Sequence, residues 1–221
     1  MVKSRKAIIN EIVDRCRGRI LDVGCTLGSL IERKGVVGLD VLPAKRDLFC
    51  QGDAEFIPFK DRIFDIIVAG ELIEHLLNPL RFLRECYRTL KNKGLLIITT
   101  PNRKSWFEKI FKLSAPKGSK NSLIRKMITS RQLKRLIGYQ SIAPPEYEPY
   151  GHKQIFDKKE LFKLCCSEGL FSSGGFFTTP YFGWDSMVGR IVSKLKCMVH
   201  SVLPRNLHES MILVLEKVDE K

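Results

Sequence analysis

The chain has 221 residues, 44% of them hydrophobic and 28% charged, which is the composition of a globular protein with a full hydrophobic core. No apolar run approaches the roughly 18 residues that a membrane-spanning helix needs. The seven cysteines are odd in number and include no CxxC pair, which argues against a disulfide framework and against a zinc site. We therefore expect reduced thiols, no metal site and a cytoplasmic location.

The net charge of +14 is concentrated in one segment of the chain. Residues 102–143 hold eleven Lys or Arg and a single Glu, so most of the excess positive charge lies there. A basic segment of this kind says more about the partner of a protein than about its fold.

Strands and helices are predicted to alternate through the first hundred residues. The predicted elements are a helix over 3–17, a strand over 19–23, the start of a short helix over 27–33, strands over 36–40, 47–51 and 62–69, a helix over 76–90, a strand over 95–100, helical stretches over 105–113 and 122–137, a helix over 157–168, a strand over 176–181, a helical stretch over 187–203 and a strand over 211–216. The alternation predicts an α/β fold in which a parallel sheet has helices on both faces.

The predicted helix over 157–168 begins at Asp157, a good N-cap residue. Its apolar positions predict that four side chains point inward: Leu161, Phe162, Leu164 and Cys165.

A glycine turn and a carboxylate are the most informative pair of features. Residues 20–28 read Ile-Leu-Asp-Val-Gly-Cys-Thr-Leu-Gly, a strand that runs into a turn, and Asp40 closes the next apolar run. Glycines let the backbone approach a ligand closely, and one carboxylate can bind two ribose hydroxyls. The pair predicts a cofactor that contains a nucleoside, while the spacing from Gly24 to Gly28 differs from the Gly-x-Gly-x-x-Gly turn of dinucleotide-binding domains.

Further residues follow in a characteristic order. Asp22, Gly24 and Gly28 are followed by Asp40, by Asp53-Ala54 and by Glu74-His75 after the predicted strand over 62–69. This series resembles the class I S-adenosylmethionine-dependent methyltransferases, of the small type that includes quinone-biosynthesis enzymes, strongly over residues 10–102 and weakly over 150–216.

The resemblance implies a Rossmann-like three-layer sandwich with a mostly parallel seven-stranded sheet and a last antiparallel strand. It also implies one methyltransferase domain over residues 1–221, with a basic helical insertion or lid over 103–150. S-adenosyl-L-methionine is the cofactor that the resemblance implies.

The resemblance implies the following cofactor-binding residues: Asp22, Gly24, Cys25, Gly28, Asp40, Val41, Asp53, Ala54, Gly70 and Glu71. Asp40 is expected to bind the ribose hydroxyls, Asp53 the adenine amine, and the Ala54 backbone a ring nitrogen. Asp22 either contacts the cofactor or holds the glycine loop through backbone amides. Thr26 replaces the middle glycine of the family motif, which is a departure in the turn.

Two histidines are candidates for catalysis. An oxygen acceptor needs a general base with a pKa near neutrality, and His75 and His152 lie in segments expected near the acceptor. The alternative is a scaffold role for His75 and a hydrogen bond to a loop carbonyl for His152. Residues 69–72 read Ala-Gly-Glu-Leu and not the Asn/Asp-Pro-Pro-Tyr/Phe of enzymes that methylate amide or nucleobase nitrogen. We therefore expect methylation at oxygen or carbon of a small-molecule or lipid-linked acceptor.

Three interpretations of the basic segment stay open. It is a solvated lid, or it meets an anionic membrane surface that carries a lipid-linked acceptor, with the protein peripheral at that membrane. It otherwise binds RNA phosphates, as an RNA methyltransferase would. A non-catalytic cofactor-binding partner subunit is a further alternative, and the sequence leaves the oligomeric state open.

Overall fold

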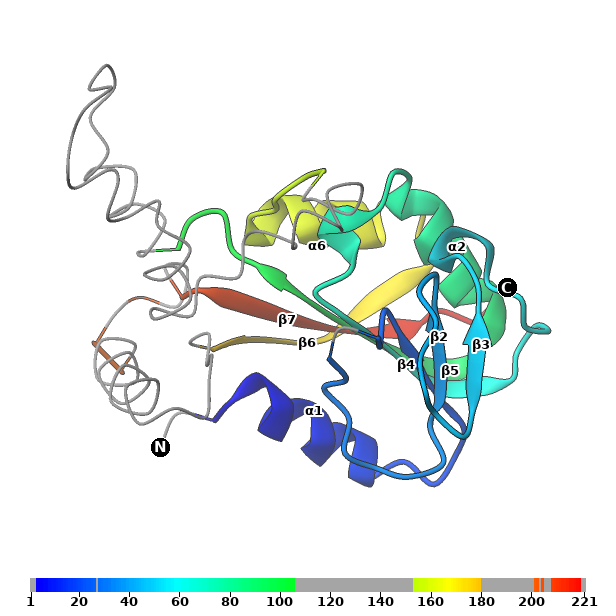
Figure 1. The fold of residues 1–221 in the computed structure, drawn as a ribbon. Helices are drawn as coiled ribbons and strands as arrows, with labels where there is room; N and C mark the ends of the chain where they lie inside the picture. Colours follow the sequence, from blue (N-terminus) through cyan, green and yellow to red (C-terminus); the bar gives the residue numbers. More distant parts are fainter. Residues whose placement is uncertain are drawn as a thin grey trace, which may run out of the picture.

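The computed structural model describes residues 3–26, 28–105, 153–179, 201–202, 204 and 208–219. In this part of the chain, seven strands form one sheet in the order β3-β2-β1-β4-β5-β7-β6 (Figure 1). The strands are β1 (Ile20–Val23), β2 (Val37–Asp40), β3 (Phe49–Gln51), β4 (Phe64–Gly70), β5 (Leu90–Pro101), β6 (Phe171–Thr179) and β7 (Ser210–Lys217). Only β7 runs antiparallel to its neighbours, β5 and β6, so the predicted fold class is confirmed.

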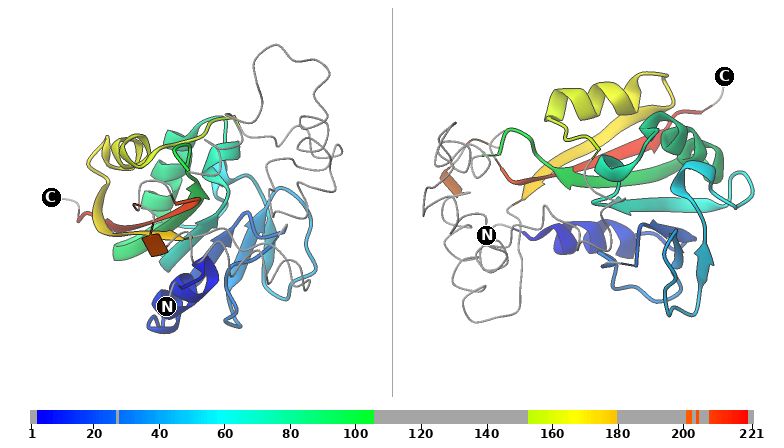
Figure 2. Two further views of the ribbon diagram at one scale, coloured as in Figure 1. Left: turned by 90° about the vertical axis from the view of Figure 1, so that its left-hand side faces the viewer. Right: turned by 45° about the horizontal axis from the view of Figure 1, so that its top comes forward.

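Helices cover both faces of the sheet. The helices are α1 (Arg5–Asp14), α2 (Pro79–Thr89), α6 (Lys158–Cys166) and the short 3-10 helices η1 (Ala54–Phe56) and η2 (Ile73–His75). Helix α1 lies on one face, and α2 and α6 lie on the other, which makes three layers (Figure 2). No helix among the described residues is long and apolar enough to cross a membrane. The predicted helices within 105–150 and 187–203 fall outside the described residues, apart from a few positions at their ends.

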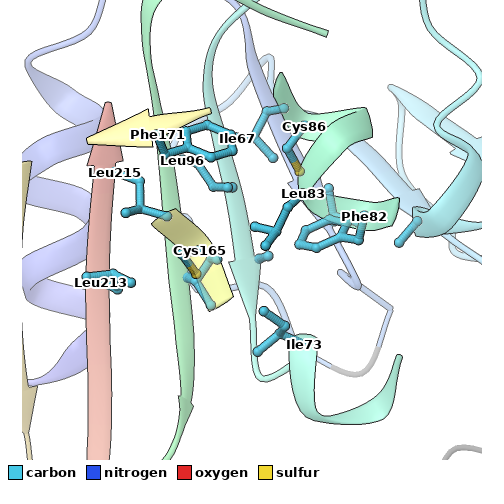
Figure 3. Packing of buried hydrophobic residues seen from close by; sticks show 14 of the residues in the cluster. Ile67, Ile73, Phe82, Leu83, Cys86, Leu96, Cys165, Phe171, Leu213 and Leu215 are labelled. Carbon is cyan, nitrogen blue, oxygen red and sulfur yellow. The ribbon is translucent and has the colours of Figure 1, made fainter. Parts of the chain in front are cut away.

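Alternate residues of the central strands enter different layers of the core. Ile66 and Val68 of β4 pack on the α1 side, while Ile67 packs on the side of α2 and α6. On that second side, Phe82 from α2 and Cys165 from α6 lie over the sheet (Figure 3). Burial on both faces explains why the strands read as continuous apolar runs in the sequence.

The predicted short helix after the glycine turn is wrong over residues 28–33, which form an irregular segment. Side chains bind its backbone amides in place of carbonyls four residues earlier: the Ile31 amide donates to Ser29 Oγ and the Glu32 amide to Asn10 Oδ1. Such contacts offer the backbone an alternative to helical hydrogen bonds.

Two smaller predictions about helices need correction. Helix α2 begins at Pro79 and not at residue 76, because Asn78 caps it by accepting from the Arg81 amide and proline favours the first helical position. Phe162 of α6 is 42% exposed and does not point into the core, whereas Leu161 and Cys165 are buried as predicted.

Asp157 fastens the start of α6 to the end of β5. Its Oδ1 accepts from the amides of Lys159 and Glu160, and the Glu160 carboxylate accepts from the Asp157 amide, which completes a capping box. Lys104 lies 2.7 Å from Asp157 Oδ2. The hydrogen bond from Lys104 is the main reason why the pKa of Asp157 is lowered from its ordinary value of 3.8 to about 2.

Asp157→Ala is expected to lower the free energy of unfolding by about 1 to 2 kcal/mol at neutral pH, because α6 loses its cap. The pKa of Asp157 is lower in the folded state, so its stabilisation is complete above the ordinary pKa of 3.8 and disappears as the pH falls through about 2. Urea unfolding should therefore show the two proteins converging in acid. Asp14→Ala, an exposed change at the end of α1, should cost less than about 0.5 kcal/mol, and an equal loss there would contradict the assignment.

Candidate functional site

The candidate site lies where the order of strands reverses in the sheet. Strand β1 pairs with β2 on one side and with β4 on the other, so the connections that leave β1 and β4 diverge to opposite sides of the sheet. A crevice at the carboxyl ends of strands forms at such a point. The structure brings most of the sequence-predicted residues that it describes to this edge, because they follow β1, β2, β3 and β4 directly.

Glycine is required at the turn after β1. Gly24 has φ +76°, and a Cβ there would lie 3.2 Å from Leu72 Cδ1, so the turn closely contacts the segment after β4. Gly28 has φ +150°, with open space where a side chain would be. Both backbones adopt conformations that L-residues rarely take, which explains two of the motif's glycines.

Asp40 joins the glycine turn to the loop after β2. Its Oδ2 accepts from the Thr26 amide and its Oδ1 from the Leu42 amide, both at 2.9 Å. The Thr26 hydroxyl also donates to the Leu42 carbonyl. Thr26 therefore braces the turn, a role that the family comparison by sequence missed. Each carboxylate oxygen of Asp40 keeps a further lone pair for a ligand hydroxyl.

Asp22 is buried, with 3% of its surface exposed. Its Oδ2 accepts from the Ser29 hydroxyl at 2.7 Å and pairs with Arg46 at 2.9 Å. Burial raises the pKa of Asp22, while the two partners act in the opposite direction. This geometry fits the loop-holding role of Asp22, which it performs through the Ser29 hydroxyl. The sequence offered no signal for Arg46, which lies in an irregular loop 24 positions away.

Cys25 packs inward from the same turn. It is 5% exposed, and a Cβ on Gly38 of β2 would lie 2.8 Å from its sulfur and 3.2 Å from Arg46 Nη1. Gly38 thus makes room for both side chains. Burial raises the pKa of the Cys25 thiol. Because that thiol is packed against β2, Cys25 can offer a ligand its backbone more readily than its sulfur.

The segment after β3 provides a second polar position. Asp53 caps η1 by accepting from the Glu55 amide through Oδ1, and its Oδ2 has no protein donor among the described residues. Ala54 is 7% exposed, and the Glu55 carboxylate accepts from the Asn78 amide, which fixes η1 against the start of α2. Val41, 39% exposed after Asp40, presents an apolar surface at this edge.

Glu71 is held in place by the N-terminal helix. It has φ +52°, its amide donates to the Thr99 carbonyl, and its carboxylate accepts from the Thr99 hydroxyl and pairs with Arg5 of α1. Just before it, Gly70 leaves space for Leu30, whose Cδ1 would lie 2.7 Å from a Cβ. Arg5 is a site residue that sequence reasoning missed, because only the packing of α1 brings it here.

Glu74 lies one turn further on, in η2. It is 1% exposed, its Oε2 accepts from the Thr100 hydroxyl at 3.0 Å, and its Oε1 has no hydrogen-bond partner in the described part of the chain. Its carbonyl accepts from the amides of Lys153 and Gln154, where the described chain resumes. Burial first and the neighbouring Glu71 second raise the pKa of Glu74 well above its ordinary value.

Of the two candidate histidines, the structure describes only His75. It ends η2, and its amide donates to the Leu72 carbonyl at 2.9 Å. His152 lies outside the described residues.

Arg46→Met is expected to lower the free energy of unfolding by about 2 kcal/mol, because Asp22 would stay buried without its cation. Adding Asp22→Asn should recover part of that loss. Arg15→Met, which breaks the exposed pair with Glu11, is the matched control and should cost less than about 0.5 kcal/mol. Urea unfolding measures all four proteins. Equal losses in the two arginine variants would show that the Asp22 pair is no stronger than a surface pair.

Comparison with known proteins shows that this chain is similar to methyltransferases. Residues 21–98 match the model of the methyltransferase domain. A probable S-adenosylmethionine-dependent methyltransferase of Mycobacterium tuberculosis is 28% identical over 116 residues, which cover 46% of this chain and 42% of that protein. The demethylmenaquinone methyltransferase of Thermotoga maritima is 32% identical over 128 residues, covering 49% and 56%. The mitochondrial ubiquinone biosynthesis O-methyltransferase of Rattus norvegicus is 35% identical over 108 residues, covering 38% and 31%.

Solved structures share the fold over most of the chain. A putative methyltransferase of Bacillus halodurans has a TM-score of 0.55 at 17% identity, covering 98% of this chain and 100% of that one. The matched region spans less than two thirds of the length of the curated relatives above. The match at residues 21–98 makes this chain similar to the methyltransferase domain family, and the sheet order in which β7 alone is antiparallel gives it the Rossmann-like fold of class I S-adenosylmethionine-dependent methyltransferases.

Proposed function

We propose that this protein is an S-adenosylmethionine-dependent methyltransferase that acts on oxygen or carbon of a small-molecule or lipid-linked acceptor. One observation carries the proposal: the Asp40 carboxylate is fixed by two backbone amides at the end of β2, directly beside the glycine turn of β1. A carboxylate held in this way is oriented before a ligand arrives, so little ordering remains to be done on binding.

The residues at the edge of the sheet fit the parts of the cofactor. Asp40 would hold the ribose hydroxyls, and the free Oδ2 of Asp53 would accept from the adenine amine with the Ala54 backbone beside it. The backbone of Gly24 and Gly28 would admit the methionine part, because neither position carries a side chain. The remaining predicted contacts, at Asp22, Cys25, Val41, Gly70 and Glu71, stay predictions, with Asp22 and Cys25 the least accessible.

Bound S-adenosylmethionine would supply a methyl group that its sulfonium has already activated. The protein then has to orient the acceptor in line with that methyl group and to accept a proton from the acceptor. His75 and His152 are the proposed proton acceptors, and the rigid ends of β1 and β4 provide the fixed frame.

Two observations support a lipid-linked acceptor. Among the relatives, one is a demethylmenaquinone methyltransferase and another a ubiquinone biosynthesis O-methyltransferase. The basic segment at residues 102–143 would favour an anionic membrane surface, where apolar acceptors reside. Phosphates of RNA would be attracted by the same charge, so the test must separate the two.

The function is tested by incubating the full chain with methyl-labelled S-adenosylmethionine and separated lipid, small-molecule and RNA fractions of a cell extract. We expect the label in an organic-soluble or small-molecule product. Label in RNA alone would favour the RNA alternative, and no transfer despite cofactor binding would favour a non-catalytic subunit.

Asp40→Ala is expected to weaken S-adenosylmethionine binding by about 100-fold or more, because the two charge-assisted hydrogen bonds proposed between Asp40 and the ribose hydroxyls are lost. Gly24→Val should do the same, since it adds a β-branched side chain at φ +76° against Leu72. Titration calorimetry measures both variants, and circular dichroism verifies their folding. Asp61→Ala, with a side chain that is 70% exposed, is the control. Unchanged affinity in Asp40→Ala would refute the site assignment.

Once a product is identified, His152→Ala is expected to lower turnover by about 100-fold while changing cofactor affinity less than about threefold, as for a general base. His75→Ala is the parallel test of the second candidate. The measurement is the initial rate at saturating cofactor, paired with calorimetry. A loss of affinity with retained turnover would remove His152 from the acceptor side.

A further inference from the structure

Two carboxyl groups and one guanidinium form a closed cluster at the end of β4. Arg5 of α1 pairs with Glu71, and the pKa of Glu74 responds to the charges of both. Thr99 and Thr100 at the end of β5 donate to Glu71 and Glu74 respectively. Elements far apart in the sequence thus converge on two acidic side chains.

When both carboxyl groups are ionised, the cluster has a net charge of about −1, because Arg5 neutralises only one of them. Arg5 is 9% exposed and pairs with Glu71, and no cation among the described residues pairs directly with Glu74. Glu74 Oε1 also lacks a hydrogen-bond partner among the described residues, although the residue is 1% exposed. An unsatisfied buried oxygen of this kind is costly, and a proton or a nearby cation would relieve it.

The cluster lies beside the glycine turn. Leu72, between Glu71 and Glu74 in the chain, is the side chain that approaches Gly24 most closely. A ligand bound at the carboxyl ends of β1 and β4 would therefore have this cluster on its β4 side.

We propose that Glu74, with Glu71 and Arg5, makes the protein bind the positively charged sulfonium of the cofactor more tightly than the neutral thioether of the product. Glu74 would do so by losing its proton when the sulfonium binds, which leaves a negative charge. This inference rests on the proposed function, because it assumes S-adenosylmethionine in the crevice. Binding of the cation would favour the ionised form of Glu74, and the proton released would go to bulk water. The thioether of S-adenosylhomocysteine provides no such charge, so Glu74 keeps its proton.

Other charged groups lie on the elements that pack around Glu74. They are Arg5 on α1, Glu71 after β4, His75 in η2, Lys153 on the returning chain and Glu209 before β7. Arg5 favours the ionised form of Glu74 and Glu71 opposes it. A single added cation can therefore shift the protonation of Glu74.

The test measures binding of S-adenosylmethionine and S-adenosylhomocysteine to the full chain by calorimetry, from about pH 5 to pH 8, in buffers of different ionisation enthalpy. We expect the ratio of their dissociation constants to favour S-adenosylmethionine by about tenfold more at the alkaline end. Binding of S-adenosylmethionine should release up to about one proton, and binding of S-adenosylhomocysteine close to none. An analogue with an ammonium group in place of the sulfonium should behave like S-adenosylmethionine.

Glu74→Gln keeps the shape of the side chain and removes its titration. The affinity ratio should then become flat with pH within about twofold, and the difference in proton release should vanish. Glu85→Gln, which changes a glutamate of α2 that pairs with Arg88, is the matched control and should behave like the unmodified chain. Arg5→Lys should keep the pH dependence because it keeps the cation.

The wild-type measurement decides the inference even if a variant does not fold. Both ligands binding with a ratio that is independent of pH would overturn it and leave the proposed function intact. Neither ligand binding would overturn both.

Discussion

The hydrogen bonds of Asp40 to the amides of Thr26 and Leu42 are the constraint on which the site depends. They join the turn after β1 to the loop after β2, so the two segments that would hold a nucleoside cannot move independently. Parallel pairing of β1 with β2 makes this contact possible, because it places both carboxyl ends at one edge. The carboxylate is part of the scaffold, and in the proposed function it is also the group that binds the ligand.

Two acids at this edge, one buried and one half-buried, pair with arginines from elsewhere in the chain. Asp22 pairs with Arg46 from the loop before β3, and Glu71 pairs with Arg5 from α1, which precedes the matched residues 21–98. A buried carboxylate without a cation would be expensive, so these pairs hold the turn and the end of β4 in shape. Glu74 is buried with no ion pair among the described residues, and this is why we propose it as the group that responds to a ligand.

The proposed binding sites for the cofactor and for the methyl acceptor rely on different interactions. The proposed cofactor site is built from short loops fixed by backbone hydrogen bonds, with one carboxylate and two glycines at its centre. The proposed acceptor is apolar or lipid-linked, and the basic segment at residues 102–143 would add long-range attraction to an anionic surface.

The sequence by itself determined the order of the strands, the glycine turn and Asp40, because continuous apolar runs and glycines with positive φ have local causes. The bounds of the strands were less accurate, since β5 and β6 begin at Leu90 and Phe171 and not at residues 95 and 176. It could not determine the irregular path of residues 28–33, where Asn10 from α1 takes an amide that a helix would have used. Arg5 and Arg46 were equally hidden, since a basic side chain has no local signature for a partner distant in the chain. Tertiary packing decided which acids lie beside a cation, because it alone brings Arg5 to Glu71 and Arg46 to Asp22.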